Sequence, residues 1–181
     1  MPNGQKLVKN NMSLLNILAF PDARLRTVAS PVAKIDGAVK NLIADMLETM
    51  YAADGIGLAA TQVNVHLRII VIDLQRGGGD PLILINPELE VLDQSTCPTE
   101  EGCLSVPGFT ETINRPKNIC VRALNKEGLA FELEPDGLLA VCIQHEIDHL
   151  NGKLFVDYLS SFKQERLKKK LGKQRHQDYP S

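Results

Sequence analysis

The chain has 181 residues, of which 44% are hydrophobic and 23% are charged, and its formal net charge is -2. These values are typical of a single globular domain and exclude a strongly basic nucleic-acid binder. No apolar run approaches the roughly 20 residues that a membrane-spanning helix needs, and the apolar stretch 14–20 is too interrupted for a secretory signal. We therefore expect a cytoplasmic protein with no membrane partner, whose four cysteines are free or metal-bound.

The first predicted helix covers residues 36–53. The polar residues 1–11 before it are expected to be a disordered leader. Residues 12–176 are expected to form a single catalytic domain, and residues 177–181 a tail. The helix is indicated by apolar residues at helical spacing, namely Val39, Leu42, Ile43, Met46, Leu47 and Met50. Asp54-Gly55 is a stop signal, and the glycine-rich segment GIGLAATQ follows at 55–62.

Strand patterns come next, at residues 67–74, 82–86, 119–124 and 129–133. A second helix is predicted at 136–150, and because it is apolar nearly all round we expect it to be buried in the middle of the fold. A basic third helix is predicted at 160–176, with Ser161 and Gln164 as a capping box. The expected fold is α+β, with mainly antiparallel sheets packed around the central helix and with an N-terminal and a C-terminal helix.

An H-E-x-x-H pattern lies on the predicted buried helix, formed by His145, Glu146 and His149. Residues four apart share a helix face, so both imidazoles can reach one metal ion. Glu146, next to the first histidine, is placed to handle a proton of a metal-bound water. The alternative, two hydrogen-bonded core histidines, leaves several buried polar groups that need partners. The pattern therefore favours a metal site.

A catalytic site of this kind needs a third protein ligand. Cys142 shares the helix face, but seven residues of helix rise about 10.5 Å, so it cannot close one site with both histidines. We expect it to be a small buried hydrophobe. Among the other cysteines, Cys103 stands out in a glycine-containing loop, whereas Cys120 alternates within a strand and Cys97 lies in a polar loop. A thiolate ligand suits Zn, Fe(II), Co or Ni better than Mg or Ca.

Three segments together resemble the signature motifs of the peptide deformylases, in the same order: GIGLAATQ at 55–62, EGCLS at 101–105 and QHEIDH at 144–149. The resemblance extends from about residue 14 to about residue 171 and is to the bacterial type with a C-terminal helix. It implies a metal-dependent amide hydrolase that removes the N-formyl group from the N-terminal formyl-methionine of nascent proteins and releases formate.

The resemblance also implies residue roles. Cys103, His145 and His149 would bind one divalent metal ion, Fe(II) in the cell, with Zn, Ni or Co also accepted. Glu146 would be the general acid/base, and Gln62 with the backbone N–H of Leu104 would stabilise the oxyanion. The nascent N-formylmethionyl polypeptide would lie against Gly55, Ile56, Gly57, Glu101, Gly102, Leu138, Val141 and Cys142. Segment 106–116 receives no role.

Two other functions stay open on the residues alone. An H-E-x-x-H zinc endopeptidase would take its third ligand downstream, from Asp157 or Glu165, and a non-enzymatic, metal-stabilised binding module would have a closed coordination shell. The C-terminal basic residues form either a solvated helix face or a docking surface for the ribosome. They are Lys163, Arg166, Lys168, Lys169, Lys170, Lys173 and Arg175.

Overall fold

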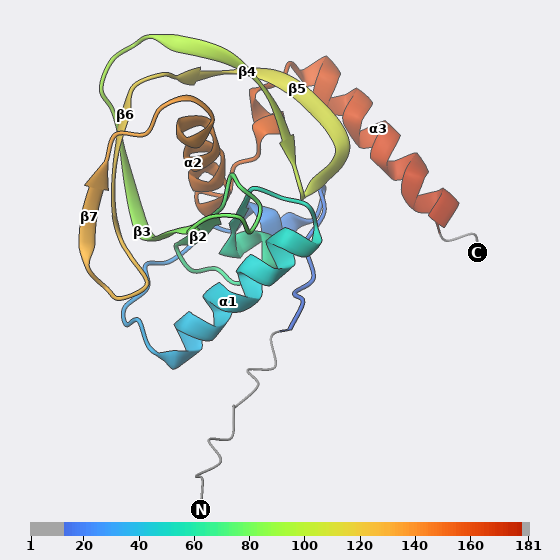
Figure 1. Ribbon diagram of the computed structural model, residues 1–181. Coiled ribbons are helices and arrows are strands. Elements are labelled where there is room, and N and C mark those ends of the chain that lie inside the picture. The colour runs from blue at the N-terminus through green and yellow to red at the C-terminus, as the bar shows by residue number, and fades with distance from the viewer. Residues whose placement is uncertain (1–12, 179–181) are drawn as a thin grey trace, which may run out of the picture.

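The computed structural model describes the backbone of residues 13–178 and the side chains of residues 13–171. The predicted leader at 1–11 and residues 179–181 of the predicted tail lie outside the described residues. Within them, three α-helices and two antiparallel sheets form an α+β fold (Figure 1). The predicted fold class is confirmed.

The larger sheet has five antiparallel strands in the order β1-β2-β3-β6-β7. Their bounds are Gly57–Ala59, Ile69–Ile72, Leu82–Val91, Ile119–Leu124 and Ala130–Leu133. Successive side chains of a strand point to opposite faces. Ile70, Ile72 and Leu84 accordingly pack in one core cluster with the central helix, whereas Ile69, Val71 and Ile83 pack in another with the first helix. Both faces are covered, which explains why all of β2 is buried.

The first helix, α1, spans Gly37–Ala52, and the carboxylate of Asp36 accepts a hydrogen bond from the N–H of Val39 at 3.1 Å as its N-cap. The central helix, α2, spans Gly137–Leu150 and lies between the large sheet and the smaller one (Figure 1). Short 3-10 turns occur at Ala23–Arg26 (η1), Ala60–Val63 (η2) and Phe155–Tyr158 (η3). The positions of α1 and α2 agree with the predicted helices.

The smaller sheet is a hairpin that the sequence analysis missed. Its strands are β4 (Thr96–Cys103) and β5 (Val106–Pro116), paired antiparallel. Strand β4 is largely exposed and contains Pro98, so it lacks the alternating apolar pattern that reveals a half-buried strand. The hairpin packs over α2 and contributes Val106 and Ile113 to a third core cluster.

Several predicted boundaries were wrong, and the strand expected at 67–74 is the shorter Ile69–Ile72. Strand β3 continues beyond residue 86 through Asn86-Pro87 to Val91, because a register shift between Ile85 and Glu88 absorbs the irregular backbone of Asn86, whose φ is 51°. A turn-forming residue followed by proline therefore marks a bulge here, whereas the prediction treated it as the end of the strand.

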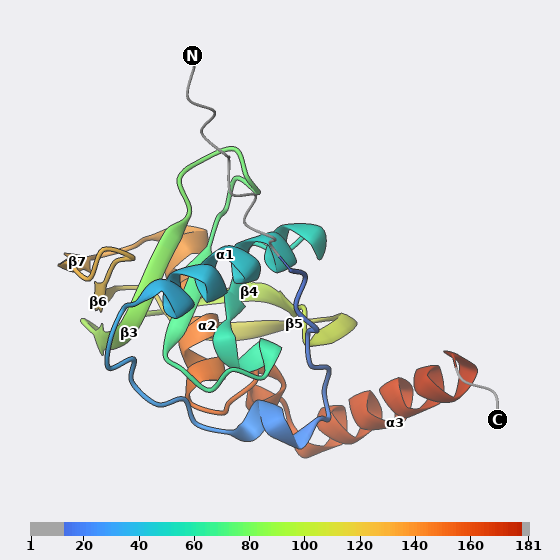
Figure 2. The same ribbon diagram turned by 90° about the horizontal axis from the view of Figure 1, so that it is seen from below.

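The C-terminal helix, α3, spans Ser161–Asp178 and continues past the predicted end at residue 176. The predicted capping box was wrong by one residue: the N–H of Lys163 donates to the Ser160 hydroxyl at 3.5 Å, and the Gln164 side chain donates to the Leu159 carbonyl. Leu167 and Leu171 anchor the helix in the core, and its far end projects from the body of the molecule (Figure 2). Among the described residues, no helix is both long and apolar enough to cross a bilayer.

Candidate active site

Cys103, His145 and His149 come together where the end of β4 meets α2. Their ligand atoms all lie within 4.8 Å of one another, and the Cys103 sulfur is 3.2 Å from Nε2 of His149. Both histidines are buried, and Cys103 is partly buried. Cys142 is not in this group, as the helix rise predicted, and in the described part of the chain these three residues form the one such group found.

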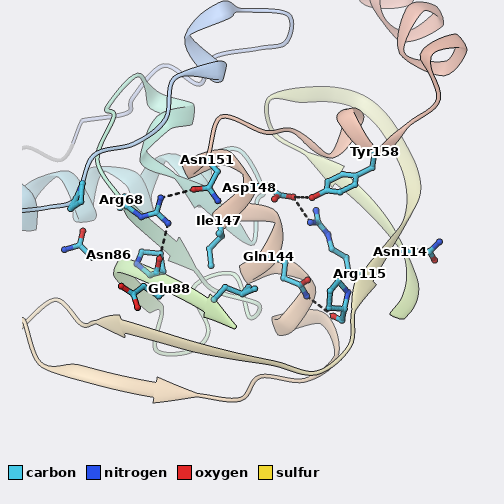
Figure 3. Close-up of a pocket in the computed structure, with 14 residues that line it drawn as sticks. Arg68, Asn86, Glu88, Asn114, Arg115, Gln144, Ile147, Asp148, Asn151 and Tyr158 are labelled. Carbon is cyan, nitrogen blue, oxygen red and sulfur yellow. Dashed lines mark hydrogen bonds and ion pairs between the residues drawn. The ribbon is translucent and has the colours of Figure 1, made fainter. Parts of the chain in front are cut away.

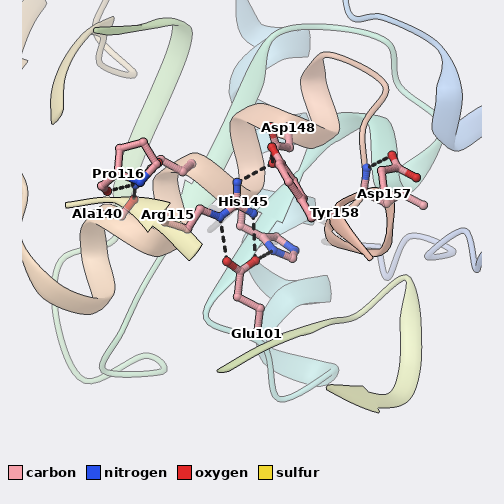
Figure 4. A network of polar contacts seen from close by, with 10 residues as sticks. Glu101, Arg115, Pro116, Ala140, His145, Asp148, Asp157 and Tyr158 are labelled. Carbon is pink, nitrogen blue, oxygen red and sulfur yellow. Dashed lines mark hydrogen bonds and ion pairs between the residues drawn. The ribbon is translucent and has the colours of Figure 1, made fainter. Parts of the chain in front are cut away.

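Glu101 holds the other nitrogen of His145. Its Oε2 lies 2.8 Å from His145 Nδ1, and both of its oxygens accept hydrogen bonds from Arg115, at 2.7 and 2.9 Å (Figure 4). Burial alone would raise the pKa of Glu101, but Arg115 and His145 bring it down to about 2. Glu101 is therefore ionised at neutral pH, and Nε2 of His145 is the nitrogen left available to a metal.

Glu146 has the environment of a proton carrier. Its side chain is buried, and Oε2 has no hydrogen-bond partner within the described residues. Burial raises the pKa of Glu146 to about 7, with the charge of His145 opposing the shift and that of Glu101 adding to it. A carboxyl group with a pKa close to neutral can both accept and release a proton near that pH. Burial, with the charges of His145 and Arg115, lowers the pKa of His149, which favours the neutral imidazole that binds metals.

Gln62 is held in a fixed orientation by turn η2. The N–H of Ala59 donates to its Oε1 at 2.8 Å, so its Nε2 faces the site, where it donates to the Ser105 hydroxyl at 3.1 Å and lies 3.7 Å from the Cys103 sulfur. The side chain is buried, with 1% of the residue surface exposed. A buried amide with both ends positioned is suited to donate a hydrogen bond to a substrate oxygen.

A cavity of about 690 Å³ opens onto these groups. Its wall contains His145, Glu146, Cys103, Leu104 and Gln62, together with the whole set predicted to bind substrate: Gly55, Ile56, Gly57, Glu101, Gly102, Leu138, Val141 and Cys142. Leu138, 52% exposed, is the most open of the apolar members. The structure thus gathers in one place segments that lie up to about half of the chain apart.

Several residues of this region were not predicted from the sequence. Arg115 belongs to the segment that received no role, and nothing in its local pattern marks it as a partner of Glu101. Ser105, the partner of Gln62, lies within the EGCLS motif, which was the one available signal. Phe109 and Arg76 also line the cavity, Arg76 from the loop between β2 and β3.

Residues 14–165 match the family model described as polypeptide deformylase. The chain belongs to this family. A peptide deformylase of Saccharophagus degradans is 61% identical over 166 residues, which cover 92% of this chain and 96% of the relative. A peptide deformylase of Pseudomonas aeruginosa is 60% identical over 166 residues, covering 92% and 99%. The crystal structure of a peptide deformylase from Legionella pneumophila superimposes with a TM-score of 0.87 at 45% identity, covering 93% and 99% of the two chains.

Peptide deformylases are metallohydrolases that remove N-formyl groups from nascent peptides, and the predicted family, function and substrate are confirmed for this chain. Neither alternative is favoured. Asp157, one of the downstream ligands that an endopeptidase would need, is occupied elsewhere: it pairs with Arg26 and accepts a hydrogen bond from the N–H of Leu154.

Proposed function

We propose that Cys103, His145 and His149 hold the single divalent metal ion of this deformylase. The observation that carries the proposal is the convergence of one sulfur and two imidazoles within 4.8 Å at the wall of the cavity. The donor set fits a metal of intermediate softness, since thiolate and imidazole suit Zn, Fe(II), Co and Ni. We propose Fe(II) as the ion in the cell, with the other three able to replace it. The carboxylate of Glu101 on His145 Nδ1 supports the same assignment, because metal-binding histidines usually carry such a partner.

A bound ion of this kind supplies Lewis-acid activation of water and of the formyl oxygen. Glu146 then has the proton-transfer role: its free Oε2 accepts a proton from the attacking water and delivers it to the nitrogen of the leaving amine. Closed off from bulk solvent and without another hydrogen-bond partner among the described residues, Oε2 is available for both transfers.

Gln62 and Leu104 have the role of stabilising charge on the formyl oxygen. Nε2 of Gln62 is aimed by the Ala59 contact, and the backbone N–H of Leu104 lies in the turn directly after Cys103. Donors that are fixed before the reaction stabilise a developing oxyanion without reorganising.

The methionine side chain of the substrate fits the apolar part of the cavity, formed by Ile56, Leu138, Val141 and Cys142. Gly55 and Gly57 allow the extended substrate backbone to approach, and Gly102 does so from β4. Glu101 contributes to the wall, but its carboxylate is bound to Arg115 and His145. Its main role is therefore to hold His145.

The proposal is tested by formate release from a formyl-Met peptide, using anaerobically purified protein of known metal content. Cys103→Ser should lose bound metal and activity together, and Glu146→Gln should keep the metal and lose activity. Glu165→Gln, on the exposed face of α3, should keep both. If Cys103→Ser binds metal as well as the unchanged protein does, the ligand assignment is wrong.

The basic face of α3 supports a second proposal, that the enzyme works in the cytoplasm docked to the ribosome. Lys168, Lys169 and Lys170 are exposed on this helix, while Leu167 and Leu171 anchor it. Replacing the three lysines by Glu should weaken co-sedimentation with ribosomes, most strongly at low salt. The matched control places Glu at the exposed Lys34, Lys40 and Lys126, which changes the net charge equally. Equal effects of both triple variants would contradict docking through α3.

A further inference from the structure

A chain of buried polar contacts leads from His145 through the protein to the other side of α2 (Figure 4). Its first link is Glu101 on Nδ1 of His145, and its second is Arg115 on both oxygens of Glu101. Nη1 of Arg115 then donates to Oδ2 of Asp148 at 2.6 Å. The side chains of Arg115 and Glu101 are 4% and 3% exposed, and that of Asp148 is 14% exposed. Asp148 is thus connected to His145 through Arg115 and Glu101, by two ion pairs and the Glu101 contact to Nδ1, although it does not touch the imidazole ring.

Tyr158, the last residue of η3, completes this chain. Its hydroxyl donates to Oδ2 of Asp148 at 2.9 Å, and its ring centre lies 5.0 Å from Cζ of Arg115. An aromatic face attracts a guanidinium, and a charge-assisted hydrogen bond orients it. Arg115 is therefore fixed by Glu101, Asp148 and Tyr158 together.

The chain of contacts ends at a second cavity, also of about 690 Å³, whose lining residues are drawn in Figure 3. None of them lines the catalytic cavity. Arg115, Asp148 and Tyr158 line the second cavity, as do Gln144 and Ile147. Residues 144, 147 and 148 share one face of the helix, whereas 145, 146 and 149 share the other. Asp148 and Tyr158 consequently meet solvent without being exposed to the substrate.

The physical consequence concerns the direction in which His145 points. A buried carboxylate that can shift lets the imidazole it holds rotate, and the partners of a ligating histidine normally fix its ring. The guanidinium of Arg115 is a planar, rigid fork, so a displacement at its Asp148 side is transmitted to its Glu101 side. Removing either outer contact should therefore loosen the Glu101 carboxylate.

We propose that Asp148 and Tyr158 are positioning residues for His145: they lock Arg115, which fixes Glu101 on Nδ1 of His145 and so aims the opposite nitrogen at the metal. This inference rests on the metal-binding role proposed for His145. Neither residue touches the substrate cavity, so both act on the reaction only through the geometry of the metal ligand.

The test is titration of metal-free protein with Co(II), followed by the absorption spectrum of the bound ion. Asp148→Ala and Tyr158→Leu should raise the Co(II) dissociation constant about 10-fold, the lower end of the effect of outer partners on metal affinity, and should change the spectrum. Asp148→Asn keeps an acceptor and Tyr158→Phe keeps the ring, so each should recover part of the affinity. In metal-free Asp148→Ala and Tyr158→Leu, ¹⁵N NMR should show that the His145 Nδ1 proton exchanges with solvent faster than in the unchanged protein.

The matched control is Asp157→Asn, which breaks the neighbouring ion pair with Arg26. It leaves the contacts that link Asp148 to His145 intact. It should bind Co(II) as the unchanged protein does. If Asp148→Ala and Tyr158→Leu match this control in affinity, spectrum and exchange, the inference is overturned. If they fail to fold, Asp148→Asn and Tyr158→Phe decide by the same comparison. Cys103→Ser separates the two proposals. If this variant retains Co(II), the metal assignment fails. If it loses Co(II) while Asp148→Ala and Tyr158→Leu bind Co(II) normally, only the positioning role is overturned.

Discussion

Gly57 and Glu146 are so close that a Cβ atom on Gly57 would stand 2.6 Å from Oε1 of Glu146. The same atom would be 2.8 Å from the sulfur of Cys142. Both distances are well below van der Waals contact, so any side chain at residue 57 must displace the proton carrier or the wall of the substrate cavity. The absence of a side chain at this position is therefore a requirement of the site.

Gly57→Ala should reduce kcat by about 100-fold or more, because a displacement of about 1 Å in a catalytic group has that effect. Metal content should stay near that of the unchanged protein, since Gly57 is not adjacent to Cys103. The measurement is steady-state deformylation of a formyl-Met peptide beside metal analysis. Gly37→Ala is the control: a Cβ there meets nothing within 4 Å, and its kinetics should be unchanged. Full activity in Gly57→Ala would contradict the role assigned to Glu146.

Gln62→Leu removes the side-chain donor proposed for the formyl oxygen while keeping the side chain buried. We expect kcat to fall about 100- to 1000-fold, the usual result of losing one such donor, with a smaller change in KM. Ser105→Ala is the companion variant, because it removes the hydroxyl that Gln62 contacts and leaves the amide itself in place. A KM effect without a kcat effect in Gln62→Leu would show that Gln62 binds the ground state only.

Asp73 should make the stability of the protein depend on acid pH. Its carboxylate accepts hydrogen bonds from the N–H of Gly77, the hydroxyl of Tyr51 and the N–H of Gln75, at 2.7, 2.8 and 2.8 Å. These bonds, the Gly77 one foremost, lower the pKa of Asp73 below its ordinary value of 3.8. The resulting contribution to the free energy of unfolding is fully present above about pH 3.8. It is lost as the pH falls through the lowered pKa of the folded state.

Asp73→Asn should therefore lower the free energy of unfolding at about pH 7, and its difference from the unchanged protein should shrink below about pH 4. Urea unfolding at a series of pH values measures this. The control is Asp80→Asn, at an exposed position of the same loop, which should leave the free energy of unfolding at about pH 7 near that of the unchanged protein. If the two proteins differ in free energy of unfolding by the same amount at every pH, the charge of Asp73 does not contribute to stability and the prediction is wrong.

The sequence predicted those parts of the molecule whose signal is local. Helices α1 and α2 follow from apolar spacing, and the metal-binding candidates follow from residue types at fixed intervals on α2. The hairpin of β4 and β5 has no such signal, because its exposed strands are polar and contain Pro98. The partners of Arg115 were equally hidden: Glu101 and Asp148 lie 14 and 33 residues away, and only folding selects them from the many acidic residues of the chain.

The metal-binding candidates come from two parts of the chain, since Cys103 and His149 lie 46 positions apart in the sequence. A new copy of the enzyme, like the proteins it acts on, is synthesised from its amino terminus onwards. Its first residue leaves the ribosome long before the hairpin and α2 are both available to assemble the site. A chain whose synthesis has not reached residue 145 contains only Cys103 of the three proposed ligands, so the metal site cannot assemble before α2 has been made.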